Sequence, residues 1–230
     1  LGVEVTAGVT THSGSVVVGA GVSVVGIVTA ASFSGSGANL SGISISSDGN
    51  QNTIAGTNAG ESFSTGNQNT FFGSRAGKSV NAGQYNTAMG HGALESATGG
   101  DFNIAIGIIS QENANGNYNI SMGYEALRSS TGSHNIAIGS QAGRSLGSAG
   151  YNTLIGYVAG YSLNNNGATE NVAIGEQALN SSTAGSKNIV IGANAAKDRD
   201  LGSDNVVIGY ESMRLSTGTQ NVAVGHQAAE

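Results

Sequence analysis

From about residue 50 to its end, the chain repeats a short pattern of apolar and polar positions. An asparagine is followed by an apolar residue, a small residue, a second apolar residue and a glycine, as in Asn135-Ile-Ala-Ile-Gly139. Alternation with a period of two is typical of a strand with one face inward. We therefore expect Ile136 and Ile138 to point into the core. The glycine predicts the end of the strand, where the chain turns tightly or approaches another backbone.

This phrase occurs eleven times, at intervals of 16 to 19 residues. A small residue, alanine or serine, stands seven positions after every anchoring asparagine, which suits a crowded interior. The anchors are Asn52, Asn69, Asn86, Asn103, Asn119, Asn135, Asn152, Asn171, Asn188, Asn205 and Asn221.

A repeat of about 17 residues predicts an all-β fold, a β-solenoid. It is too short for a helix pair or a propeller blade, but it fits a coil of two short strands and two turns. Coils stacked about 4.8 Å apart would place each repeat position in a column along the axis. The asparagines would then form a structural ladder of side-chain amides. Because such a narrow coil buries little apolar surface alone, we expect a homo-oligomer.

The phrases "HNIAIGSQA", "ENVAIGEQA" and "QNVAVGHQA" resemble the head repeats of YadA-like trimeric autotransporter adhesins. The resemblance covers roughly residues 50–230. It implies a left-handed parallel β-roll that forms a homotrimer around a central axis. Coils of 16 to 19 residues are longer than those of that family, so we expect the additional residues to form a longer outer loop.

Residues 1–49 lack the period and are rich in Val, Ser, Gly and Thr, which predicts a separate β-rich shaft or adaptor segment. The stretch "GIVTAASFSGSGANLSGIS" resembles segments of structural and tail-fibre proteins of marine T4-like cyanophages. That resemblance implies a virion protein. We also expect the chain to be a segment of a longer protein.

Composition narrows the range of partners and chemistries. The chain has 38 Gly, no Pro, Cys or Trp, and only 5% aromatic residues, so its core must use Ala, Ile, Val and Gly. A net charge of −6 without a basic stripe argues against a nucleic-acid partner. No apolar run reaches the roughly 18 residues of a membrane span, so we expect no membrane insertion.

No group of residues suggests a catalytic, cofactor or metal site, and we predict a protein that is not an enzyme. His91 and His226 occupy the same repeat position, but eight coils separate them, so they cannot share a metal ion within one chain. A threefold axis could bring three copies of one histidine together, but an exposed position on an outer turn is the favoured interpretation.

Nine positions after the anchors, nine of eleven residues are charged. We expect this column to face water, where ion pairs contribute about 0–1 kcal/mol each and serve solubility and register. Contact with a ligand or a neighbouring subunit is the alternative. The column contains Glu61, Lys78, Glu95, Glu112, Arg128, Arg144, Tyr161, Asn180, Lys197, Arg214 and Glu230.

Five consecutive coils carry a ring immediately before the anchor, and these are the candidate receptor-binding residues: Tyr85, Phe102, Tyr118, His134 and Tyr151. Tyr124, Tyr157 and Tyr210 recur five positions after their anchors. Ring faces can stack on sugars, and hydroxyl groups can bond to them. Mutual stacking, or packing on a neighbouring chain, is the structural alternative.

The leading functional hypothesis is a phage tail fibre or similar appendage on the virion surface that contacts the host. Weak contacts to a host cell-surface glycan or lipopolysaccharide would be combined through multivalency, and other virion proteins would hold the fibre. One alternative is a purely structural spacer whose binding tip lies elsewhere. Another is a bacterial trimeric autotransporter-type adhesin on a bacterial cell surface.

Overall fold

The computed structural model describes residues 50–113, 115–163, 167–182 and 184–230. The predicted shaft or adaptor segment, residues 1–49, lies outside the described residues.

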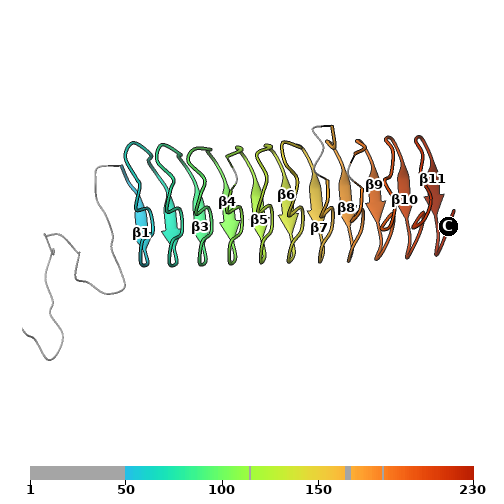
Figure 1. Ribbon diagram of the computed structural model, residues 1–230, viewed down its shortest axis with the longest axis horizontal. Coiled ribbons are helices and arrows are strands. Elements are labelled where there is room, and N and C mark those ends of the chain that lie inside the picture. The colour runs from blue at the N-terminus through green and yellow to red at the C-terminus, as the bar shows by residue number, and fades with distance from the viewer. Residues whose placement is uncertain (1–49, 114, 164–166, 183) are drawn as a thin grey trace, which may run out of the picture. The chain divides into compact units, whose positions relative to one another are not determined.

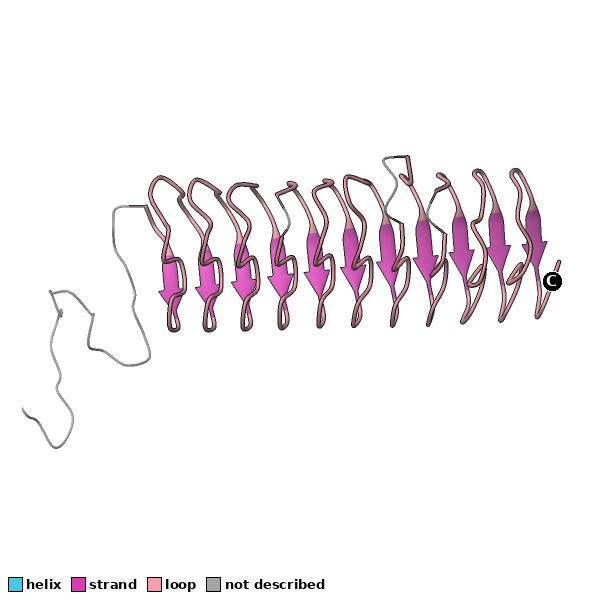
Figure 2. Ribbon diagram, viewed as in Figure 1, coloured by secondary structure: helices cyan, strands magenta, loops and turns pink. Residues whose placement is uncertain are grey.

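The described part is a β-solenoid with one short strand in each coil (Figures 1 and 2). All neighbouring strands are parallel, and they form one sheet in the order in which they occur along the chain. The prediction of an all-β solenoid with about 17 residues per coil is confirmed. The strands are β1 (Thr53–Ala55), β2 (Thr70–Phe72), β3 (Thr87–Met89), β4 (Ile104–Ile106), β5 (Ile120–Met122), β6 (Ile136–Ile138), β7 (Thr153–Ile155), β8 (Val172–Ile174), β9 (Ile189–Ile191), β10 (Val206–Ile208) and β11 (Val222–Val224).

The register pairs each repeat position with the same position of the next coil. Ile136 of β6, for example, pairs with Ile120 of β5 and with Thr153 of β7. We call one coil with its strand a rung and name it by the strand. Parallel strands lie about 4.8 Å apart, so every repeat position forms a column along the solenoid.

The expected second strand of each coil is replaced by a hydrogen-bonded segment with left-handed residues. In the β5 rung, Glu125 has a φ of 55° and Leu127 a φ of 50°. The same two positions are left-handed in most rungs, and residues in this region cannot continue an extended strand. The segment still bonds to its neighbours, since the Leu127 N–H donates to the Ala142 carbonyl at 3.0 Å and Ser129 to Arg144 at 3.0 Å.

The predicted direction of the strand residues is wrong. In β2 to β11 the middle residue is buried, and the first and third residues lie half-buried or exposed on the outer face. Ala137 is fully buried, whereas Ile138 is 37% exposed. The middle residue packs inside beside the column seven positions after the anchor, where Ala142 is also fully buried, and a strand can turn only one of its two faces inward.

In rungs β1 to β10, close backbone contact fixes the glycine four positions after the anchor. Gly139 has a φ of 132°, and a Cβ atom there would lie 2.4 Å from the carbonyl oxygen of Gly156 in the next rung. Neither the conformation nor the space admits a side chain. The column of glycines therefore sets how closely the rungs stack.

Candidate binding surface

The outer face of the sheet is an apolar strip that runs along all eleven strands. Neither of the two outward positions of these described strands carries a charged residue. The first positions hold Thr, Ile or Val, and the third positions are all apolar. We call these two columns the apolar strip. The most exposed of its large side chains are Phe72, Met89, Ile104, Met122, Ile138, Ile189, Ile208, Val222 and Val224.

Beside this strip, the five predicted ring residues form one continuous stack. We call it the ring ladder. Its centroid separations lie between 4.6 and 5.0 Å, and its interplanar angles between 3° and 20°. All five residues are left-handed, with φ from 57° to 62°, and all five are exposed. The members in order are Tyr85, Phe102, Tyr118, His134 and Tyr151.

Stacking changes what the ring ladder can offer to a ligand. The faces between successive rings are covered by the rings themselves, so a sugar cannot stack there as the sequence pattern suggested. The exposed parts are the ring edges, which carry the positive side of the aromatic quadrupole. Edge contacts and hydrogen bonds are therefore the chemistry that remains along the ladder.

The column five positions after the anchors is less regular. Tyr124, Tyr157 and Tyr210 are exposed in separate rungs. Tyr210 stacks on His226 with a centroid distance of 5.3 Å. His91 and His226 lie in rungs β3 and β11, and the described residues contain no group of three or more His, Cys, Asp or Glu that could hold a metal ion.

The anchoring asparagines form a buried ladder of amides. The Asn135 side-chain oxygen accepts from the backbone N–H of Asn152 at 3.0 Å and from its Nδ2 at 3.2 Å. Asn135 Nδ2 in turn donates to the carbonyl oxygen of Ala149 at 3.0 Å. The same oxygen-to-backbone bond recurs from Asn52 through Asn221, so the ladder ties each rung to the next.

A second polar column, which sequence reasoning missed, runs two positions before the anchors. Asp101 accepts from the N–H of Gln84 at 2.8 Å, Asn117 from Asp101 at 2.8 Å, and Ser133 from Asn117 at 2.9 Å. The recurrence of Asn, Asp, Ser or Thr at this position was the signal that could have found it, since short polar side chains bond readily to nearby backbone.

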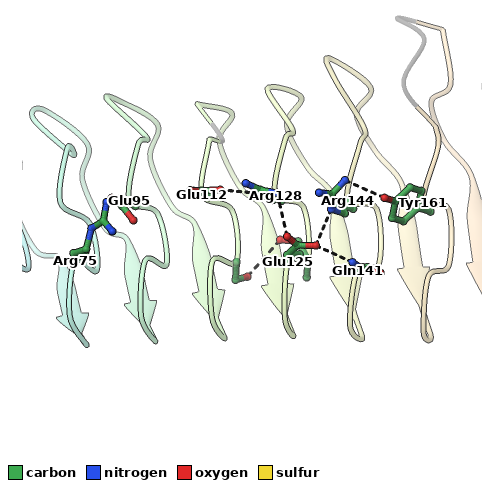
Figure 3. A network of polar contacts seen from close by, with 10 residues as sticks. Arg75, Glu95, Glu112, Glu125, Arg128, Gln141, Arg144 and Tyr161 are labelled. Atoms are coloured by element: carbon green, nitrogen blue, oxygen red, sulfur yellow. Dashed lines mark hydrogen bonds and ion pairs between the residues drawn. The ribbon is translucent and has the colours of Figure 1, made fainter.

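The charged column is less exposed than predicted, and its arginines share a carboxylate from another column (Figure 3). Glu95 is buried and pairs with Arg75. Glu125, which is 5% exposed, accepts from Arg128 at 3.1 Å and from Arg144 at 2.8 Å. The like charges of Arg128 and Arg144, which occupy the same position in successive rungs, are therefore offset by a residue that the repeat pattern did not single out.

Two opposing effects act on the pKa of Glu125. Burial works to raise it, but hydrogen bonds from Gln141 and Arg144, with the charges of Arg144 and Arg128, outweigh burial and lower the pKa. Hydrogen bonds to Glu112 and Glu125 raise the pKa values of Arg128 and Arg144, respectively. The cluster is thus a network of oppositely charged groups whose hydrogen bonds satisfy one another.

The chain matches no known family model, no curated protein and no solved structure. Among the described residues, no helix is long and apolar enough to cross a membrane.

Proposed function

We propose that this chain is a fibre segment of a phage virion, a homotrimeric left-handed β-roll that contacts the host surface. The observation that carries the proposal is the apolar strip along all eleven strands. A face without charge along the whole length of a rod is typical of a surface that a partner covers.

The size of the strip supports a stable association. Ten intervals of about 4.8 Å and a strand width of about 10 Å give an apolar area of about 500 Å² before the flanking columns are added. A monomer rarely exposes a single apolar patch larger than about 300–600 Å², and stable interfaces bury about 800 Å² per partner. The strip therefore lies at the upper end of what a monomer exposes and supplies more than half of the area that a stable interface buries.

A second copy of the same chain is the partner that fits best. Only a rod with the same rung spacing can match one outward residue with another over eleven successive rungs. The trimeric state rests on the phrase "HNIAIGSQA" and its resemblance to trimeric autotransporter heads. The phage context rests on "GIVTAASFSGSGANLSGIS" and its resemblance to cyanophage structural proteins.

The alternative of a structural spacer has one observation in its favour. The ring ladder covers most of its own faces by stacking, so its rings can contribute to rigidity without any ligand. A spacer would share the fold and the trimer but would bind nothing along its sides. A bacterial trimeric adhesin is the remaining alternative, with a cell surface in place of a virion.

Light scattering of the purified chain tests the assembly. We expect the mass of three chains for the wild type. Ile138→Lys combined with Ile155→Lys places charges in the apolar strip and should give monomers. Thr131→Lys, on an exposed loop, is the matched control and should remain trimeric. A monomeric wild type would refute the proposed assembly. A separate experiment, immunogold electron microscopy of virions, would decide between a virion fibre and a bacterial adhesin.

A further inference from the structure

We propose that the ring ladder binds an extended, neutral β-1,4-linked glycan lying parallel to the solenoid axis. The inference rests on the proposed host contact and names the class of ligand. It concerns the five rungs β3 to β7.

The ladder provides hydrogen-bonding groups at a regular distance. Tyrosines stand at the first, third and fifth positions, with Phe102 and His134 between them. Their hydroxyl groups therefore recur every second rung, about 9.5 Å apart by the strand spacing. No hydrogen bond from the hydroxyls of Tyr85, Tyr118 or Tyr151 occurs among the described residues, so these groups are available to a ligand.

An extended β-1,4-linked glycan has the same periodicity. One sugar advances about as far as one rung, and successive sugars are turned over relative to each other. Equivalent hydroxyl groups on one side of the chain therefore recur every second sugar, as the tyrosines recur every second rung. An α-1,4-linked glucan coils and cannot follow a straight ladder.

The chemistry of the ring ladder favours sugar oxygens. Ring edges carry partial positive charge, and tyrosine hydroxyls both donate and accept hydrogen bonds. Through these five rungs, neither the ladder nor the adjoining first strand positions carry a lysine, arginine, aspartate or glutamate. Without a fixed cation to pair with phosphate or sulfate, the ring ladder suits a neutral glycan better than an anionic one.

The site is a line of weak contacts, so its affinity should grow with ligand length. A disaccharide spans only two rungs, whereas a hexasaccharide covers the whole ladder. Contacts made by one linked chain combine through effective concentration. Three ladders in the proposed trimer would add a second level of the same effect.

Calorimetric titration of the full chain with cellohexaose and chitohexaose tests the inference, with cellobiose and maltohexaose as ligand controls. We expect binding of at least one β-linked hexaose and none of maltohexaose or cellobiose. The triple substitution Tyr85→Phe, Tyr118→Phe and Tyr151→Phe keeps the stack and removes its hydroxyls. It should weaken hexaose binding about 10- to 1,000-fold, for three lost hydrogen bonds of ordinary strength.

The matched control variant removes three other hydroxyls, by Tyr124→Phe, Tyr157→Phe and Tyr210→Phe, and should bind as the wild type does. The inference is overturned if neither hexaose binds, if maltohexaose binds equally well, or if the ladder variant retains wild-type affinity. Light scattering of the same samples separates the two proposals, because a trimer that binds no hexaose leaves the fibre intact and removes only the ligand.

Discussion

At the scale of single residues, the interior of several coils is filled by two positions whose sizes compensate. The middle residue of the strand faces the residue eight positions after the anchor. In rung β2 the pair is Phe71 and Gly77, and in rung β3 it is Ala88 and Leu94. A Cβ atom on Gly77 would lie 2.4 Å from the ring of Phe71. In each of these two rungs the coil therefore holds one large side chain, from one side in β2 and from the other in β3.

This compensation predicts a strong coupling between Phe71 and Gly77. Phe71→Ala should destabilise the chain by about 3–5 kcal/mol through the cavity it leaves. Gly77→Leu should cost about 1–3 kcal/mol or more by overpacking. The double variant recreates the β3 arrangement, in which Leu94 already has a φ of 53°, and should be more stable than the sum of the two changes. Additive free energies of unfolding in denaturant would contradict the compensation.

The asparagine ladder leads to a prediction at the same scale. Asn135→Ala removes the acceptor of the Asn152 backbone N–H and leaves that buried donor without a partner. A buried unsatisfied group costs about 1–3 kcal/mol, and more than one group is affected. Gln220→Ala, in an exposed position, is the control and should change stability by less than about 0.5 kcal/mol. Equal losses in the two variants would argue against the ladder.

At the scale of the structural element, the rung is held by its strand on one side and by the charged network on the other. The strand is only three residues long, so the left-handed segment must contribute to the stacking of rungs. Glu125 of rung β5 contacts Gln141 and Arg144 of rung β6. The network therefore joins two rungs across the face that carries no strand.

This arrangement predicts a dependence of stability on pH. The pKa of Glu125 is lowered in the folded chain, so its contribution is fully present above the pKa of the unfolded glutamate, about 4.3, and is lost as the pH falls through the lower folded value. Glu125→Gln should cost about 1.5–3 kcal/mol at neutral pH. The difference between wild type and variant should shrink on acidification below about pH 4. A difference that stays constant with pH, measured by urea unfolding, would show that the charge of Glu125 is not involved.

The element is also where prediction from the sequence succeeded and failed. The period, the parallel stack and the small residue at Ala142 follow from recurrence alone. The sequence alone does not say which face of the strand points inward. Both faces of Ile136, Ala137 and Ile138 are apolar, and a period of two does not distinguish the buried face from the exposed one. Glu125 was missed because its role depends on contacts with the next rung.

At the scale of the whole molecule, each of the strands β1 to β11 pairs only with its neighbours in the described part of the chain. Stability is then a sum of rungs and of the interfaces between them. One broken interface should divide the stack into two blocks instead of unfolding it uniformly. The glycine column provides a direct test, because its members share one conformation but differ in what lies next to them.

Gly139 and Gly225 have φ values of 132° and 136°. A Cβ atom on Gly139 would lie 2.4 Å from the Gly156 carbonyl oxygen, whereas one on Gly225 would contact only Ala228, at 3.8 Å. Both alanine variants carry the conformational cost of about 1–3 kcal/mol, but only Gly139→Ala must also separate rungs β6 and β7.

We therefore expect Gly139→Ala to be the less stable variant of this chain and to lose hydrogen-exchange protection first at the amide of Gly156, which donates to Ile138 at 2.8 Å. Gly225→Ala should keep the wild-type protection there. Equal destabilisation by the two substitutions would mean that conformation alone, and not close stacking, selects glycine. A uniform loss of protection from β1 to β11 in Gly139→Ala would mean that the rod unfolds as one cooperative unit instead of rung by rung.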